Sequence, residues 1–259
     1  MKAIILCGGF ATRLEPITKF VPKPLLPIGG KPILDYILTD LSADGLDEID
    51  IHISTNHKFY DQFDYYLDHR KEKLKRSNIR VCKEPSTHNG NKFGAIKGIL
   101  HTINTFGIDD DVIIIAGDNF YDFTLKGCIN DFMKDRQLTI CVHPVGSFEE
   151  AKRFGVVEME GDFIKAFHEK PPEPVSKLIS TGIYLIPREY IRLVHKYIED
   201  KNNPDAPGFF IQWLVNNGTN IKGYKTSGKW FDIGTLATYE EVFKLYEKDA
   251  ALPQRNAST

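Results

Sequence analysis

The chain begins with an apolar run that ends in two glycines, Ala3-Ile4-Ile5-Leu6-Cys7-Gly8-Gly9, and continues as Phe10-Ala11-Thr12-Arg13-Leu14. The apolar run has the composition of a buried β-strand. Paired glycines directly after a strand let backbone N–H groups approach phosphate oxygens closely. The stretch therefore predicts a strand and a phosphate-binding turn, although by itself it equally fits an ordinary tight turn. Neither the Walker A spacing nor the G-x-G-x-x-G spacing of dinucleotide-binding proteins occurs in the chain.

Two cations lie close to this turn in the sequence. Arg13 follows the glycines, and Lys23 begins the segment Lys23-Pro24-Leu25-Leu26-Pro27-Ile28. An arginine binds phosphate oxygens as a planar fork, and a lysine adds a compact point charge. The pair therefore suits a triphosphate better than a neutral ligand.

Together these segments resemble the signature of the sugar-1-phosphate nucleotidylyltransferases. The resemblance covers almost the whole chain, and the later matches follow in the family's order: Gly117-Asp118-Asn119, Phe154-Gly155-Val156-Val157, Glu169-Lys170-Pro171, Thr181-Gly182-Ile183-Tyr184 and Trp230-Phe231-Asp232-Ile233-Gly234-Thr235. One departure is Ala11, because the family commonly has glycine there. If that residue needs a positive φ, alanine costs about 1 kcal/mol of strain.

Composition limits the class of protein. With 33 Lys+Arg against 35 Asp+Glu, the net charge is −2, which disfavours nucleic acid as the main partner. Four cysteines without a C-x-x-C pair, Cys7, Cys82, Cys128 and Cys141, suggest buried thiols in a reducing compartment. No run is apolar enough for a membrane span or a signal peptide. We therefore expect a cytoplasmic protein that binds neither membrane nor nucleic acid.

The pattern of elements predicts an α/β fold, a Rossmann-like doubly wound and mostly parallel sheet in a single domain. Expected strands are Ala3–Leu6, Ile49–Ser54, Ile79–Cys82, Val112–Ala116 and Leu138–Val142, with helical patterns between them. Beyond residue 150 we expect an added β-hairpin around Gly161-Asp162 for the sugar, a strand over Ser180–Ile186 and a last helix from Thr235 to Lys248. The predicted division is a nucleotidyltransferase domain over residues 1–248 and a loose tail over 249–259. Family members often carry a further C-terminal domain, and we expect none here.

Acidic residues are informative only where they follow a strand, because ligands of open α/β sheets collect at the carboxyl ends of strands. Asp109-Asp110-Asp111 precedes the strand Val112–Ala116, and we interpret it as a solvated turn and strand start. Asp118 follows that strand and is the better ligand for Mg²⁺, which prefers oxygen and usually needs one or two carboxylates. The histidine spacing indicates no zinc site.

Asp232 lies between large apolar residues and a glycine, and a carboxylate in such surroundings must be paired or metal-bound. Without the resemblance, a helix N-cap fits it as well. The resemblance implies that Asp118 and Asp232 share a catalytic Mg²⁺.

The resemblance also implies roles for other residues. The catalytic residues would be Arg13, Lys23 and Asp118. The nucleotide-binding residues would be Leu6, Gly8, Gly9, Thr12, Arg13, Lys23, Glu84, Gly90 and Gly94. The residues that bind the sugar phosphate would be Asn119, Gly155, Glu169, Lys170 and Thr181. Without the surrounding motifs, Glu169-Lys170 would fit a solvent-facing pair at a strand end.

The expected reaction transfers a nucleoside monophosphate from a nucleoside triphosphate to a hexose 1-phosphate and releases pyrophosphate. The motifs favour glucose 1-phosphate with dTTP or UTP. Glu84 stands where thymidylyl members usually have glutamine, so cytidylyl transfer to glucose 1-phosphate and guanylyl transfer to mannose 1-phosphate stay open. Two other classes are a catalytically silent nucleotide-sugar-binding subunit or sensor and a metal-dependent glycosyltransferase, although the latter would need its acidic motif after a strand. Assembly into a homo-oligomer is left open.

Overall fold

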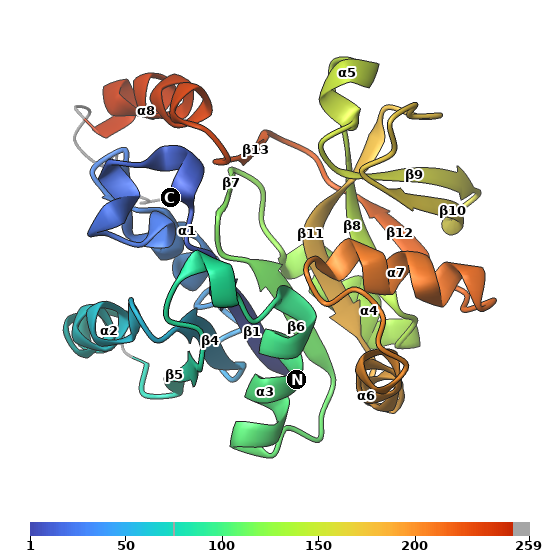
Figure 1. The fold of residues 1–259 in the computed structure, drawn as a ribbon, viewed down its shortest axis with the longest axis horizontal. Helices are drawn as coiled ribbons and strands as arrows, with labels where there is room; N and C mark the ends of the chain where they lie inside the picture. Colours follow the sequence, from blue (N-terminus) through green and yellow to red (C-terminus); the bar gives the residue numbers. More distant parts are fainter. Residues whose placement is uncertain (75, 251–259) are drawn as a thin grey trace.

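The computed structural model describes residues 1–74 and 76–250, and the predicted tail beyond residue 250 lies outside the described residues. Its main feature is a sheet of nine strands in the order β5-β4-β1-β6-β11-β8-β12-β10-β9 (Figure 1). The bounds are Lys2–Cys7 for β1, Asp50–Asn56 for β4, Ile79–Glu84 for β5, Val112–Ala116 for β6, Thr139–Pro144 for β8, Gly155–Glu160 for β9, Phe163–Glu169 for β10, Leu178–Ile186 for β11 and Lys222–Lys225 for β12. The α/β class and the mostly parallel sheet are confirmed.

The first half of the chain forms the parallel part of the sheet. The opening strand β1 lies between β4 and β6 and is parallel to both, and β5 extends the sheet beyond β4. Side chains alternate along β1, so that Ala3 and Ile5 face one hydrophobic cluster and Ile4 faces the other. Both faces are therefore covered, which explains why the strands of this half are almost entirely apolar.

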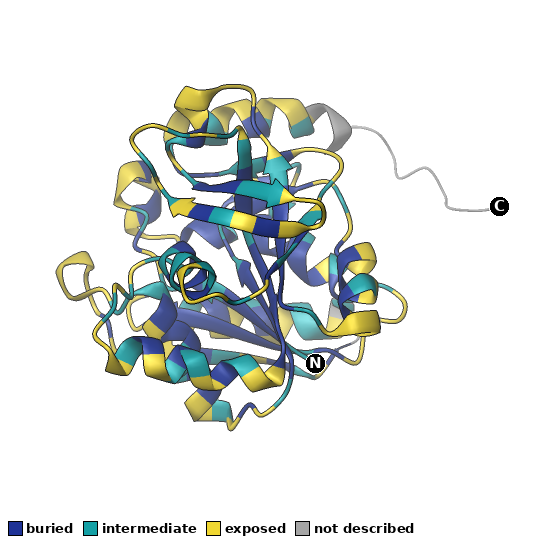
Figure 2. Ribbon diagram, turned by 90° about the vertical axis from the view of Figure 1, so that its right-hand side faces the viewer, coloured by how far each residue is buried: buried dark blue, intermediate teal, exposed yellow. Residues whose placement is uncertain are grey.

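Helices cover the two faces of the sheet, as a doubly wound fold requires. One face packs against α1 (Ile33–Asp40), α2 (Tyr60–Leu74) and α4 (Lys126–Asp135). The other face packs against α3 (Ala95–Phe106), α6 (Ile191–Glu199) and α7 (Pro207–Asn216). Figure 2 shows the resulting layers, with buried strands in dark blue between helices whose outer sides are exposed.

The second half of the chain departs from the parallel pattern. Strand β11 is antiparallel to both β6 and β8, and β9 and β10 form the predicted hairpin, with Gly161 at φ 59° in its turn. Strand β9, at the edge of the sheet, also pairs with β11 through Val156 and Ile179. The segment of the sheet from β11 to β9 is therefore closed on itself. Helix α7 lies against β10 in this region. The short α5 (Phe148–Ala151) leads into β9.

A third layer joins the two ends of the chain. The last helix, α8 (Leu236–Ala250), packs with Leu26, Ile28 and Ile33 of the first half, where β2 (Pro27–Ile28) pairs with β3 (Lys31–Pro32). Next to it, β7 (Asn119–Tyr121) pairs with β13 (Trp230–Asp232) in an antiparallel ribbon. This ribbon brings the Gly-Asp-Asn and Trp-Phe-Asp motifs together.

The four cysteines are buried and free, as the composition predicts. Cys128 and Cys141 approach each other to 3.3 Å between their sulfur atoms. Within residues 1–74 and 76–250, no helix is long and apolar enough to cross a membrane.

Candidate active site

The glycine-containing turn follows the end of β1 and leads into a 3₁₀ turn over Thr12–Leu14. Ala11 precedes that turn with φ 48° and ψ 40°, a left-handed conformation, and its carbonyl accepts a hydrogen bond of 2.8 Å from the Thr18 hydroxyl. The position that is often glycine in the resembled family therefore has a positive φ here as well. The alanine pays about 1 kcal/mol in strain for it.

Lys23 forms an ion pair with Asp118 across the site. Its Nζ lies 2.6 Å from Asp118 Oδ2, and the lysine side chain is only 10% exposed. Burial raises the pKa of the Asp118 carboxyl, but Lys23 outweighs this effect and holds the pKa below its usual value. Two residues far apart in the sequence are thus held together as a charged pair.

Asp232 reaches the same place from the other strand of the ribbon. It pairs in register with Asn119, and the Ile233 N–H donates to the Asp118 carbonyl over 3.3 Å. Burial, and then the neighbouring Asp118 carboxylate, raise the pKa of Asp232. The two carboxyl groups that the sequence assigned to a metal therefore share one space.

This pair has the chemistry that a magnesium ion needs. Mg²⁺ takes oxygen ligands and is commonly held by one or two carboxylates, with water and substrate phosphates completing its shell. No group of three or more histidine, cysteine, aspartate or glutamate side chains is arranged for a metal within the described part of the chain. Asp118 and Asp232 thus fit Mg²⁺ better than a metal that requires a closed protein shell.

A cavity of about 300 Å³ opens beside the glycine turn. Five residues assigned to the nucleotide line it, namely Leu6, Gly8, Gly9, Glu84 and Gly94. Its far wall comes from the start of α3 and from the loop of residues 205–207. The other four residues assigned to the nucleotide are outside the lining of this cavity: Thr12, Arg13, Lys23 and Gly90.

Glu84 forms part of the floor of the first cavity. Its side chain is buried, and the Ser54 hydroxyl donates to its Oε1 over 2.8 Å. A Cβ atom at Gly8 would lie 2.5 Å from Glu84 Oε1, and one at Gly98 would lie 2.8 Å from the same oxygen. Both glycines therefore leave room for this carboxyl, whose pKa is raised by burial.

A second cavity of about 380 Å³ adjoins the first, and Asp118 lines both. Asp232 and all five residues assigned to the sugar phosphate also line it: Asn119, Gly155, Glu169, Lys170 and Thr181. Arg13 reaches it from the glycine turn. Part of the predicted nucleotide set and all of the predicted sugar-phosphate set thus line two adjoining cavities, and Asp118 lines both.

Glu169 is seated in this second cavity between two glycines. A Cβ atom would come within 3.0 Å of Glu169 Oε2 at Gly155 and within 1.8 Å at Gly208. Lys170 Nζ lies 3.7 Å from Glu169 Oε1, and burial raises the pKa of the carboxyl. Lys170 itself has φ 49°, which turns the chain at the end of β10. Close packing, rather than solvent, surrounds this carboxylate.

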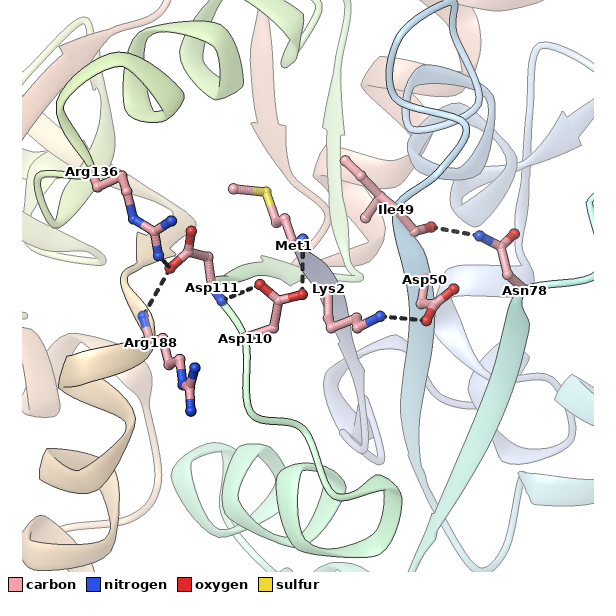
Figure 3. A network of polar contacts seen from close by, with 9 residues as sticks. All are labelled: Met1, Lys2, Ile49, Asp50, Asn78, Asp110, Asp111, Arg136 and Arg188. Atoms are coloured by element: carbon pink, nitrogen blue, oxygen red, sulfur yellow. Dashed lines mark hydrogen bonds and ion pairs between the residues drawn. The ribbon is translucent and has the colours of Figure 1, made fainter.

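The acidic run Asp109-Asp110-Asp111 directly precedes β6 and so lies at the opposite, amino end of the strands, where Figure 3 shows Asp110 and Asp111. Asp110 Oδ2 is 3.0 Å from the amino group of Met1. Asp111 accepts from Arg136 over 2.5 Å and from the Arg188 N–H over 2.9 Å. Its assignment to a strand start is correct, but Asp111 is buried and ion-paired rather than solvated.

Sequence reasoning missed several residues that line the site. Arg153 and Tyr184 line the second cavity, and the segment Ala206–Gly208 forms part of its wall. Arg153 directly precedes the Phe154-Gly155 match, which was the available signal for it. Nothing in the composition of residues 206–208 marks them as part of a site.

Comparisons with known proteins identify the family of the chain. The model of the nucleotidyl transferase family matches residues 2–249. The chain is 31% identical over 257 residues to a glucose-1-phosphate adenylyltransferase of Fusobacterium nucleatum, covering 92% of this chain and 64% of that protein. It is 28% identical to a UTP–glucose-1-phosphate uridylyltransferase of Synechocystis, covering 94% of this chain and 63% of that protein. The chain thus spans less than two thirds of the length of these relatives.

A solved structure of a UDP-glucose pyrophosphorylase in complex with UDP-glucose has the same fold. The TM-score is 0.78 at 21% identity, and the match covers 96% of this chain and 98% of that chain. At this identity the likeness concerns the fold alone. Because the family model covers nearly every residue, the chain belongs to the nucleotidyl transferase family.

Proposed function

We propose that this protein transfers a nucleoside monophosphate from a nucleoside triphosphate to a hexose 1-phosphate, giving a nucleoside diphosphate sugar and pyrophosphate. The observation that carries the proposal is the position of Asp118, which lines both cavities, with Asp232 beside it in the second cavity and Lys23 paired with it. One cavity is lined by the glycine turn, and the other by the residues assigned to a sugar phosphate. The α-phosphorus of a nucleotide in the first cavity would then lie close to a sugar phosphate in the second.

The chemistry requires positioning and charge neutralisation more than proton transfer. An oxygen of the sugar 1-phosphate forms a bond to the α-phosphorus of the nucleotide, and the bond from that phosphorus to the bridging oxygen breaks. Pyrophosphate leaves with the electron pair of that bond. The attacking phosphate is already anionic at neutral pH, so no general base is needed, and electrostatic stabilisation dominates.

The cations of the site divide between the substrates in this scheme. Lys23 stabilises the α-phosphate, since it is buried beside Asp118, and Arg13 stabilises the departing pyrophosphate. Lys170 binds the phosphate of the sugar, while Glu169 accepts hydrogen bonds from sugar hydroxyls. Asp118 and Asp232 would hold Mg²⁺, which neutralises phosphate charge when it is bound.

Glucose 1-phosphate with dTTP or UTP is the proposed substrate pair. Glu84 supports a base with an N–H donor, because an ionised carboxylate only accepts hydrogen bonds. Thymine and uracil offer one such donor at N3. Guanine offers two adjacent donors, so GTP with mannose 1-phosphate is the second candidate, and cytosine offers an amino donor at N4, so cytidylyl transfer to glucose 1-phosphate stays open.

A catalytically silent subunit or sensor is the alternative from another class. A sensor needs no second carboxylate at the junction and no lysine beside the sugar phosphate, whereas both Asp232 and Lys170 line the cavity. Four free buried thiols support a reducing, cytoplasmic setting for the enzyme.

The decisive experiment measures pyrophosphate release for a grid of sugar 1-phosphates against the five common nucleoside triphosphates, with Mg²⁺. We expect the largest signal with glucose 1-phosphate and dTTP or UTP. The Asp118→Asn variant should bind the same nucleotide but release little pyrophosphate. If no pair gives product while wild type and Asp118→Asn bind nucleotide alike, the protein is not this enzyme.

A further inference from the structure

Arg153 stands beside the acid pair without a role in the proposed scheme. It lies between α5 and β9 and lines the second cavity together with Lys170 and Arg13. Its Nη2 is 3.5 Å from Asp232 Oδ2, and its side chain is 44% exposed. The guanidinium thus borders both the candidate metal ligand and the space assigned to the sugar phosphate.

The hydrogen-bonding capacity of this guanidinium is largely unused. Within the described residues, its one hydrogen-bond partner is Asp232, and 3.5 Å is long for a charge-assisted bond, which usually measures about 2.7–2.9 Å. The ring of Phe154 lies 5.4 Å away and supports the side chain. By contrast, Arg188 at the other end of the sheet makes two close contacts to Asp109. Arg153 therefore retains free donors beside a cavity.

The charges around the second cavity give these donors a use. Among its lining residues, Asp118, Asp232 and Glu169 are acidic and would repel a phosphate dianion. Lys23, the closest cation to Asp118, is already paired with it at 2.6 Å. Arg153 lies on the Asp232 side, where a planar fork can bind two phosphate oxygens while its charge offsets the nearby carboxylate.

We propose that Arg153 binds the phosphate group of the sugar 1-phosphate and so acts as a second cation for it, alongside Lys170. The assignment rests on the proposed function, because it takes the second cavity as the sugar-phosphate site. If Arg153 instead acts only through Asp232, it is a positioning residue, and its loss would change kcat or the Mg²⁺ requirement but not sugar-phosphate affinity.

The first test compares Arg153→Gln, Arg153→Lys and Lys152→Gln in steady-state kinetics with glucose 1-phosphate. Lys152 is a matched control, because this neighbouring cation pairs with Glu149 at 2.5 Å on α5 and does not line the cavity. Arg153→Gln should raise the KM for the sugar phosphate about tenfold, the loss of one charged hydrogen bond, and leave the nucleotide KM within twofold. Arg153→Lys should recover part of that loss.

Either of two kinetic results overturns the inference. One is an Arg153→Gln variant whose sugar-phosphate KM stays within twofold of wild type while kcat falls or the Mg²⁺ requirement rises. The other is an equal rise of the KM in Lys152→Gln, which would indicate a general loss of positive charge. If wild type makes product and Arg153→Gln behaves in either way, the proposed function stands and this inference fails.

A second test does not require turnover. Phenylglyoxal modifies accessible arginines, and mass spectrometry follows Arg153 and the exposed Arg192 separately. Glucose 1-phosphate or mannose 1-phosphate should slow the modification of Arg153, whereas the free sugars should not, and Arg192 should react at the same rate throughout. An absence of protection by either ester overturns the inference, even if the wild-type protein proves inactive.

Discussion

Acidic residues gather at both ends of the sheet, and the two gatherings differ in how their charges are satisfied. At the amino end, Asp109 pairs with Arg188. Asp110 pairs with the amino group of Met1, and Asp111 pairs with Arg136 (Figure 3). At the carboxyl end, Asp118 has one lysine and Asp232 has one arginine 3.5 Å away. The carboxyl-end acids border the two cavities of the candidate site, so their remaining oxygens can meet a ligand there, whereas Asp109 borders a separate cavity together with Arg136 and Arg188.

The difference follows from topology. Parallel strands run from the amino end to the carboxyl end, and ligands of such sheets bind beyond the carboxyl ends. The acids before β6 therefore form ion pairs that hold neighbouring segments together, and the acid after β6 lies in the candidate active site. We therefore expect substitution of Asp118 to affect catalysis and substitution of Asp111 to affect stability.

The largest effect is expected for Asp118→Asn. This change removes one of two carboxylates that fit Mg²⁺ and separates Lys23 from its charged partner, so pyrophosphate release should fall about 10³-fold. The matched control is Asp109→Asn at the amino end, which should leave the rate unchanged. Near-UV circular dichroism checks that both variants are folded. An Asp118→Asn protein that keeps more than a tenth of the wild-type rate would contradict the division between the two ends.

Asp111→Asn should affect stability instead of catalysis. The Asp111 side chain is 3% exposed and pairs with Arg136, whose side chain is 51% exposed. Because one partner is partly solvated, we expect a loss of about 1–3 kcal/mol in the free energy of unfolding, less than for a fully buried pair. Urea denaturation measures it, with Asp109→Asn as the exposed comparison. A large loss of activity in folded Asp111→Asn would break the comparison.

Much of this fold could be predicted from the sequence, because the spacing of apolar residues and the local composition determine which segments form helices, strands and turns. The alternation along β1, the glycine of the β9–β10 turn and the apolar stripe of α1 are each set by neighbouring residues. The antiparallel insertion of β11 between β6 and β8 could not be predicted in this way. Which strands pair depends on contacts between segments far apart in the chain, such as Tyr184 with Ile114 and Ile140.

The distinction between local signals and contacts remote in sequence applies to the site as well. Asp118 could be placed by its position after a strand, and Asp232 needed the family resemblance, because its partner strand β7 is remote in sequence. The only signal for Arg153 was its position directly before the Phe154-Gly155 match, and that position does not indicate a role. All of the assigned roles stay predictions, and Thr12, Lys23 and Gly90 lie outside the lining of both cavities of the candidate site.

A smaller effect is expected for Ala11→Gly at the carboxyl end. Glycine removes the strain of a left-handed alanine, and the greater freedom of the unfolded chain offsets part of the gain, so stability should rise by up to about 1 kcal/mol. Ala237→Gly on the exposed side of α8 is the matched control and should lose about 0.5–1 kcal/mol. Thermal denaturation compares the two. Equal losses in both variants would mean that the turn carries no strain that glycine relieves.

The smallest effect is expected for Asp50→Asn at the amino end. Lys2 donates to Asp50 over 2.6 Å and lowers the pKa of that carboxyl. A lowered pKa in the folded state means that the pair stabilises the protein fully above the unfolded value of about 3.9, and that this contribution disappears as the pH falls through the lower folded value. Asp50→Asn should therefore cost less than about 1 kcal/mol at pH 7 and flatten the loss of stability below about pH 4. Urea midpoints measured from pH 3 to pH 7 test this, and parallel curves for the two proteins would show that Lys2 does not stabilise this end through charge.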